Sequence, residues 1–522
     1  MPAPFAYATI SEALSDRARS HADHVAYIDG DRPHTFAEAD AASDRIAGAL
    51  LARGFECGDR IGIIAPNQIE WVVLFFAAAK IGVAVVGLTV RYRDSEIEYM
   101  ANDSRMKAVF TVAEHDGFDF LDMFRRLSDR LPALQTVVAI GGGAQGQPTF
   151  EDFMGSVPDR RALSEARSRV RGGDLAMVIY TSGTTGRPKG TALTHRSMLA
   201  SAGAQADHVR ANDQDLIQLA MPLNHVGGIT CGILTQMLGG GTCELVPVFK
   251  ADTVLEMMRR HPPTQVSGVP TMLTLLLMNP RSAEVDLSGV RLVITGGTNV
   301  DDTLLGRLQQ RMPQATLMNL YGLSESSGAI VMTPWECDDE SLMTSIGRPL
   351  SGAELRVVAD GETDAAPGEV GELRFRGLGV VEGYIGAAAS ASPIDDQGWL
   401  RSGDLGEVDA RGYIYLRGRQ KDMYIQGGFN VYPAEVEGHI ARHPDVLMVA
   451  GIGVPDPVLG EIGRYYIVPR PEAELTEQAI LDHCASLADY KIPRQIVFRG
   501  ELPLTPAGKI QKAALRAEEK PQ

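Results

Sequence analysis

Residues 175–190, LAMVIYTSGTTGRPKG, join an apolar run to a loop rich in glycine and hydroxyl side chains. The run 175–181 is continuous in hydrophobicity, which is typical of a strand covered on both faces of a parallel sheet. In the loop, backbone N–H groups and hydroxyls can surround phosphate oxygens, and glycines permit close approach. The stretch therefore predicts a buried strand that ends in a phosphate-binding loop, although a surface turn could have the same composition.

The loop does not have the spacing of a Walker loop, which requires G-x-x-x-x-G-K-[ST]. Gly183 and Gly186 are three residues apart, Lys189 follows Gly186 by three, and Pro188 lacks a backbone donor. The sequence therefore excludes the commonest phosphoryl-transfer fold.

Apolar runs of the same kind recur along the chain between longer helical patterns, at 60–65, 107–112, 136–140 and 291–297. Alternation of such strands with helices predicts an α/β protein with mostly parallel sheets. After about residue 350, short alternating strands separated by glycine predict a small antiparallel sheet or barrel. A compact α+β segment of about 100 residues follows, and its first helix is expected to begin at Pro433.

The length of 522 residues suggests about three structural units. We expect a large domain over 1–418, with two doubly covered sheets and a barrel-like subdomain at about 345–418. A hinge at 419–422 and a small mobile lid over 423–522 complete the expected organisation.

Composition excludes several classes of function. A hydrophobic content of 44% and a charged content of 22% are typical of a soluble globular protein. A net charge of −17 argues against nucleic-acid binding, which needs a basic surface. The five cysteines are scattered without metal-ligand spacing, and the first residues lack an export signal, so a cytoplasmic protein with reduced thiols is expected.

The most membrane-like segment, residues 71–90, is long enough to span a bilayer. Lys80 and Gly82 divide it, however, and a buried helix capped at Asn67 followed by a short strand is the better interpretation.

Further motifs follow the loop in a fixed order. They are MPLNHVGG (221–228), VITGGTNV (293–300), NLYGLSESSG (319–328), WLRSGDLGEVDARGYIYLRGRQKDMYIQGGFNVYPAEVE (399–437), YKIPRQIVF (490–498) and LPLTPAGKIQK (502–512). With the loop, this set resembles the adenylate-forming superfamily, which includes acyl-CoA synthetases, luciferases and nonribosomal-peptide adenylation domains. The resemblance covers nearly the whole chain and implies that a carboxylate attacks the α-phosphorus of ATP to give an acyl adenylate and pyrophosphate.

The resemblance also implies roles for individual residues. The loop is expected to hold the β- and γ-phosphates through Thr181, Ser182, Gly183, Thr184, Thr185 and Lys189. Thr181 and Glu325 are expected near Mg²⁺, which prefers oxygen ligands. Ser324 stands where the family commonly has threonine and keeps the hydroxyl.

For the nucleoside, the resemblance places adenine between Gly296–Gly297 and the ring of Tyr321, with Thr298 and Gly322 in the same two motifs. Asp404 is expected to accept from both ribose hydroxyls. Arg419 is expected to contact the ribose or a phosphate.

The remaining roles concern the reacting groups. Lys509 is implied to be the catalytic lysine that bridges the carboxylate and the α-phosphate. His225 is expected near the carboxyl end of the acyl pocket, although a core histidine is an alternative there. Lys421 matches the hinge position of the family, and Gly427 and Gly428 are expected to keep an acceptor channel open.

Three functions remain open at this point. The leading one is an acid:CoA ligase, because 427–437 and 490–494 look like stand-alone acyl-CoA synthetases and no carrier domain follows residue 522. A stand-alone ligase that delivers the acyl group to an amine is the second, and a nucleotide-binding protein without catalysis is the third. No cationic residue stands out in the presumed pocket segments, which favours an apolar monocarboxylic acid. The sequence leaves open whether the protein is a monomer or a homodimer.

Overall fold

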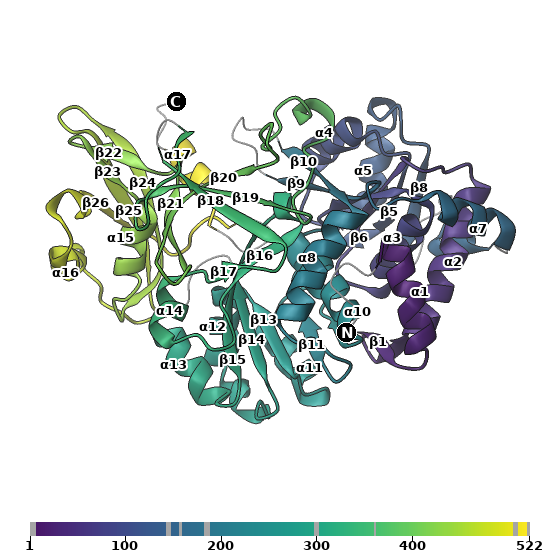
Figure 1. Ribbon diagram of the computed structural model, residues 1–522, viewed down its shortest axis with the longest axis horizontal. Helices are drawn as coiled ribbons and strands as arrows, with labels where there is room; N and C mark the ends of the chain where they lie inside the picture. Colours follow the sequence, from purple (N-terminus) through teal and green to yellow (C-terminus); the bar gives the residue numbers. More distant parts are fainter. Residues whose placement is uncertain are drawn as a thin grey trace.

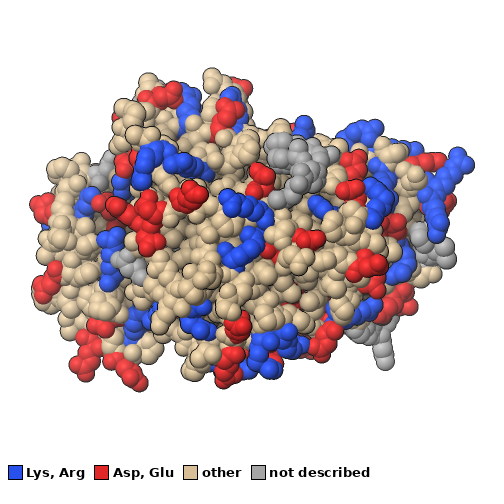
Figure 2. Space-filling model, turned by 60° about the horizontal axis from the view of Figure 1, so that its bottom comes forward, with Lys and Arg blue, Asp and Glu red and all other residues tan. Residues whose placement is uncertain are grey.

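A computed structural model describes residues 7–141, 148–155, 159–181, 188–296, 302–359, 362–504 and 510–518. Parallel sheets covered by helices make up the larger part, and a small α+β unit lies at the other end (Figure 1). The α/β class expected from the sequence is confirmed. On the face drawn in Figure 2, acidic and basic side chains are interspersed.

The first sheet has six strands in the order β10-β9-β4-β3-β5-β8, all parallel to their neighbours except β10, which runs antiparallel to β9. The strands are β3 (Arg60–Ile64), β4 (Ala84–Leu88), β5 (Ala108–Val112), β8 (Thr136–Ile140), β9 (Leu175–Thr181) and β10 (Lys189–Thr194). Four of the apolar runs singled out in the sequence are thus strands of one sheet.

Helices cover both faces of this sheet. Val85 and Met177 face one core with α1 (Ile10–Ser20), α2 (Phe36–Ala52), α3 (Ile69–Ile81) and α7 (Arg160–Arg169). Their neighbours Val86 and Val178 face a second core with α4 (Asp94–Ser104) and α5 (Phe120–Leu127). Because successive side chains of a strand point to opposite faces, two cores require the unbroken apolar runs seen in the sequence.

The second sheet has five strands, and its order is β13-β14-β15-β16-β17. The strands are β13 (Gln265–Gly268), β14 (Leu292–Gly296), β15 (Thr316–Leu323), β16 (Gly328–Met332) and β17 (Arg348–Pro349). Strands β13, β14 and β15 are parallel to one another, and β16 runs antiparallel to both of its neighbours, β15 and β17. One face packs on α11 (Ala251–Arg260), α12 (Pro270–Met278) and α13 (Asp302–Arg311), and the other on α8 (His195–His208).

A third sheet, which the sequence did not predict, also contains parallel strands. It consists of β11 (Leu216–Leu219), β12 (Thr242–Leu245), β1 (Val25–Asp29) and β2 (Arg32–Thr35), in that order. The large region therefore has three sheets with parallel strands where the sequence predicted two. A sequence cannot show which distant strands share hydrogen bonds, so it could not reveal this division.

The short alternating strands after residue 350 form an open antiparallel sheet in the order β18-β19-β20-β21. They are β18 (Ala353–Val358), β19 (Gly371–Gly377), β20 (Leu400–Val408) and β21 (Ile414–Arg419). Their apolar side chains pack on β16 and on Ile346. This sheet lies between the five-stranded sheet and the small unit in Figure 1.

The small unit has a five-stranded sheet with a core on each face. Its strands are β22 (Tyr424–Gln426), β23 (Phe429–Val431), β24 (Val446–Asp456), β25 (Gly460–Pro469) and β26 (Gln495–Phe498). Its helices are α15 (Pro433–Ile440), α16 (Glu477–His483) and α17 (Lys512–Glu518). Helix α15 begins at Pro433 as expected, since proline fits the first helical position.

The membrane-like segment is the buried helix α3 followed by strand β4, as expected, and α3 ends at Gly82 in the left-handed conformation. No helix in the described ranges has the length and apolarity to cross a bilayer. The expected cap was wrong: Gln68 is the N-cap residue of α3, and it makes no side-chain cap bond. The Asn67 side chain instead donates to Leu219 O and Met221 O, because the neighbouring chain offers it buried carbonyl groups.

Lys80 is fully buried on α3, and its ammonium pairs with Asp40 at 2.7 Å and with Asp44. Replacement by methionine should lower the free energy of unfolding by about 3 kcal/mol, because it leaves the Asp40 carboxylate without its cation and leaves Asp44 with Arg167 alone. Urea unfolding followed by tryptophan fluorescence measures this, and the more exposed pair Lys107–Asp59 supplies the control Lys107→Met. Equal small losses for the two variants would contradict the prediction.

Candidate functional site

The phosphate loop lies between two antiparallel strands rather than between a strand and a helix. Thr181 ends β9 and Lys189 begins β10, and the two residues are direct partners in the ladder. Both ends of the loop are therefore held together by the sheet. Four expected loop residues, Ser182, Gly183, Thr184 and Thr185, lie outside the described residues.

A segment from far along the chain joins β10 at the edge of this sheet. Ala192 N donates to Gly383 O at 3.1 Å, and Ile385 N donates to Gly190 O at 2.8 Å. Val381 N in the same segment donates to the carbonyl of Glu325 at 2.9 Å. The segment thus ties the strand after the phosphate loop to the turn that carries Glu325.

Glu325 lies in a single 3₁₀ turn, Ser324–Ser326, between β15 and β16. The turn is closed by Ser326, whose hydroxyl accepts from Leu323 N and lies 2.7 Å from Gly328 O. The Glu325 carboxylate is half-buried, and its Oε1 accepts from the hydroxyl of Tyr384 at 2.8 Å. The Lys189 ammonium lies 5.2 Å from the centroid of the Tyr384 ring. Tyr384 therefore links Glu325 to Lys189, which is the ladder partner of Thr181.

Tyr384 is the residue at this site that the sequence analysis missed. Nothing in its local pattern separates it from an ordinary strand tyrosine, and only the folded chain places it beside two charged groups. Burial raises the pKa of its phenol, and the Glu325 carboxylate raises it further. The hydroxyl therefore stays protonated and acts as a donor.

A second group of predicted residues meets at Asp404, which is 5% exposed. Tyr321 on β15 donates its hydroxyl to Asp404 Oδ2 at 2.6 Å, and Arg419 Nε lies 2.9 Å from Oδ1. Asp404 and Arg419 face each other across β20 and β21. The Asp404 carboxylate raises the pKa of Arg419, and burial raises that of Tyr321 ahead of the carboxylate. The structure thus joins three residues that the sequence assigned to the nucleoside.

The glycines of the two motifs assigned to adenine are also required by the packing of the strands that carry them. A Cβ on Gly296 would lie 2.6 Å from Leu320 O, and one on Gly322 would lie 2.1 Å from Gly328 O. Close approach of neighbouring strands therefore requires glycine at both positions. Gly297 and Thr298 lie outside the described residues.

His225 is half-buried and is the N-cap residue of the short helix α9 (Val226–Gly228). Its Nδ1 accepts from Gly227 N at 3.0 Å, which fixes the ring. A π-helical turn, Ile229–Leu234, follows directly, and such turns occur frequently at functional sites. His225 therefore has a defined orientation beside a buried apolar turn.

The segment expected to be the hinge, 419–422, is anchored at both of its ends. Arg419 is held by Asp404 on one side, and Asp422 pairs with Arg516 of α17 at 2.7 Å on the other. Asp422 N donates to Arg419 O at 2.9 Å, so the segment forms a turn with the exposed Lys421 inside it.

Gly427 and Gly428 form the turn between β22 and β23, with φ values of 59° and 87°. Positive φ explains glycine at both positions in this arrangement. The turn lies on the small unit, away from β9 and β10 (Figure 1). Lys509 lies outside the described residues.

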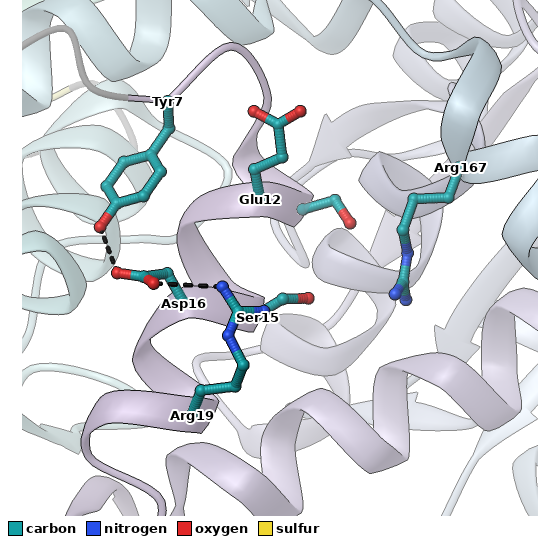
Figure 3. A pocket seen from close by; sticks show the side chains of 7 residues that line it. Tyr7, Glu12, Ser15, Asp16, Arg19 and Arg167 are labelled. Atoms are coloured by element: carbon teal, nitrogen blue, oxygen red, sulfur yellow. Dashed lines mark hydrogen bonds and ion pairs between the residues drawn. The ribbon is translucent and has the colours of Figure 1, made fainter.

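A surface pocket of about 410 Å³ lies between α1 and α7, apart from these residues (Figure 3). Its charged groups and the Tyr7 hydroxyl already have partners: Tyr7 donates to Asp16 at 2.6 Å, Arg19 pairs with Asp16 at 3.1 Å, Arg167 pairs with Asp44, and Glu12 accepts from Ala8 N at 2.9 Å. We assign it no ligand.

Two family models match the chain: the AMP-binding enzyme over residues 14–385, and the AMP-binding enzyme C-terminal domain over residues 435–509. A curated relative from Rhodococcus jostii is 34% identical over 98% of this chain and 99% of its own length. It is a CoA ligase for a propanoyl group that carries a methyl-dioxo-octahydroindenyl ring system.

Two solved structures extend the comparison. An anthranilate CoA ligase in complex with anthranoyl-AMP has a TM-score of 0.90 and 27% identity, with 98% of each chain covered. The amide bond synthetase McbA from Marinactinospora thermotolerans has a TM-score of 0.84 and 28% identity, with 97% of this chain and 99% of that chain covered. From its family models, its relatives and its fold, the chain belongs to the adenylate-forming superfamily and is an AMP-forming acid:CoA ligase.

Proposed function

We propose that the enzyme activates an apolar monocarboxylic acid with ATP and then transfers the acyl group to the thiol of CoA. In the first step a carboxylate oxygen bonds to the α-phosphorus and pyrophosphate leaves. In the second step the CoA sulfur bonds to the acyl carbon, AMP leaves and the thiol proton passes to solvent. The observation that carries the proposal is that Tyr384 links Glu325 to Lys189, the ladder partner of Thr181, at one strand end of the six-stranded sheet.

The residues at this meeting point suit Mg²⁺ bound together with ATP. A carboxylate and a hydroxyl supply oxygen ligands, and no cluster of three or more metal-ligating side chains occurs in the described ranges. Mg²⁺ is commonly held by one or two protein ligands together with substrate phosphates. When bound, the ion would neutralise phosphate charge, while Lys189 would contact the β- and γ-phosphates.

We assign the nucleoside to the second group of residues. Asp404 would accept from the ribose hydroxyls, Arg419 would hold the Asp404 carboxylate, and Tyr321 would flank the adenine near Gly296. Ser182, Gly183, Thr184, Thr185, Gly297 and Thr298 are proposed to complete the nucleotide site, with Ser324 and Gly322 in the turn beside it. His225 would lie at the carboxyl end of the acyl pocket, and Lys509 would bridge the carboxylate and the α-phosphate.

The acid is proposed to be apolar because charged residues are absent from the turn that follows His225. The turn Ile229–Leu234 contains four apolar residues and one threonine, and Val226, Ile229 and Ile233 are buried. The acyl groups named for the two CoA ligases above are both of single-carboxyl acids, a bicyclic propanoic acid and anthranilic acid.

Transfer to an amine is the alternative acceptor reaction, and it is favoured by the likeness to an amide bond synthetase. The test is to offer ATP, a panel of fatty, aromatic and alicyclic acids, and either CoA or an amine. Pyrophosphate release identifies the acid, and the mass of the product identifies the acceptor. An absence of pyrophosphate release with every acid would overturn the proposal.

We further propose that residues 1–418 and 423–522 are two domains joined by a hinge at 419–422. We also propose that the enzyme works in the cytoplasm, where CoA and ATP are available and where five free cysteines stay reduced.

An Asp404→Asn variant should raise the KM for ATP by about 10- to 100-fold, because hydrogen bonds to a charged group contribute about 1.5–3 kcal/mol. Initial rates of pyrophosphate release at increasing ATP measure this change. Asp409→Asn is the matched control, since Asp409 is a carboxylate on the nearby β20–β21 turn that bonds Tyr415 and Arg411. Equal KM values for the two variants would contradict the ribose assignment.

A further inference from the structure

Tyr384 contacts both charged side chains at the phosphate end of the site, Glu325 and Lys189. It lies in residues 381–385, which follow β19 and reach across to the edge of the six-stranded sheet. The backbone of this segment is fixed by bonds to Gly190, Ala192 and Glu325. The segment is therefore anchored to β10 and to the Glu325 turn independently of the Tyr384 side chain.

To the part of the chain that the structure describes, the side chain makes one polar contact and one ring contact. Its hydroxyl donates to Glu325 Oε1 at 2.8 Å, and its ring lies under the Lys189 ammonium at 5.2 Å. A phenol that is half-buried could donate to water instead, so packing does not require this bond. The bond restrains one carboxylate oxygen and leaves Oε2 for another partner.

Such a contact has a known physical effect. Outer groups that hydrogen-bond a metal-binding carboxylate orient it, and their loss typically costs 10- to 100-fold in metal affinity or activity. A ring beneath an ammonium restrains the position of that cation as well. The two contacts of Tyr384 thus act on the proposed metal ligand and on the proposed phosphate ligand.

We propose that Tyr384 is a positioning residue for MgATP, which orients the Glu325 carboxylate through its hydroxyl and the Lys189 ammonium through its ring. This role rests on the proposed function of Glu325 and Lys189. It makes separate predictions for the hydroxyl and for the ring, because phenylalanine removes the first and leucine removes both.

The test measures ATP binding by calorimetry at increasing Mg²⁺, without acid or CoA. In Tyr384→Phe, the Mg²⁺ concentration that gives half-maximal ATP binding should rise about 10-fold, while ATP affinity at saturating Mg²⁺ changes little. In Tyr384→Leu, ATP affinity at saturating Mg²⁺ should fall as well. Tyr415→Phe is the matched control, because Tyr415 also donates to a carboxylate, Asp409, at 3.1 Å outside the site.

A double-mutant cycle separates positioning from packing. Once Glu325→Gln has removed the carboxylate charge, adding Tyr384→Phe should shift the Mg²⁺ dependence no further. Additive shifts, an unchanged Mg²⁺ dependence in Tyr384→Phe, or a lowered Tm with uniform loss of ATP affinity would each overturn the proposal. Because no acid is present, failure of the ligase proposal would appear separately, as absent pyrophosphate release by an enzyme that still binds MgATP.

Discussion

A Lys509→Ala variant is expected to form the acyl adenylate about 10²–10³ times more slowly than the parent enzyme. The attacking carboxylate and the α-phosphate are both anions, and their negative charge must be neutralised while the new bond forms. A lysine that bridges them provides this neutralisation only when it is in place. Removing one such preorganised donor therefore affects the adenylation step directly.

The second half-reaction should be largely spared in this variant. It starts from a neutral acyl carbon and an AMP leaving group, and the lysine that neutralised the first step is not required at that stage. The measurement compares pyrophosphate release from ATP and acid with thioester formation from chemically prepared acyl-AMP and CoA. Lys512→Ala is the control, because Lys512 lies three residues further along and pairs with Glu437 instead. Equal loss in both half-reactions would exclude the proposed role of Lys509.

A Lys421→Pro variant is expected to lose thioester formation by on the order of 10²-fold while adenylation is affected much less. Arg419 is anchored to Asp404, and Asp422 is anchored to Arg516, so the proposed rotation between the two units would occur at the residues between them. Proline locks φ near −65° and also restricts the residue before it. Misplacement of a reacting group by about 1 Å can cost about 10²-fold.

The same pair of half-reaction assays measures this effect as a ratio of two rates. Lys421→Ala is the matched control, since it removes the ammonium and keeps the backbone free to rotate. We expect the ratio in Lys421→Ala to stay near that of the parent enzyme. An unchanged ratio in Lys421→Pro would mean that the units rotate elsewhere or do not rotate.

Strand positions and fold class were predictable from the sequence because they depend on local patterns. Residues 61–65 and 175–180 carry no charged side chain and are almost wholly apolar, and each run forms most of a strand covered on both faces. Pro433 marked the start of α15 for an equally local reason, its fixed φ. The cap at Asn67 was wrong because the side chain bonds carbonyls about 150 residues away, which no local pattern encodes.

Candidate residues for the nucleotide site were proposed from the sequence, through ordered motifs around Thr181, Glu325 and Asp404. The contacts that these residues make could not be predicted, because each contact joins segments that lie far apart in the chain. Tyr321 meets Asp404 across 83 residues, and Tyr384 meets Glu325 across 59.

The sequence alone determined which side chains are available for chemistry and which strands are covered on both faces. It also determined that the loop after residue 181 is not a Walker loop. Only the tertiary structure decided that parallel strands divide among three sheets and that Tyr384 lies between Glu325 and Lys189. The reason is that hydrophobic periodicity depends on neighbours along the chain, whereas strand pairing and side-chain contacts depend on which distant segments bury their surfaces together.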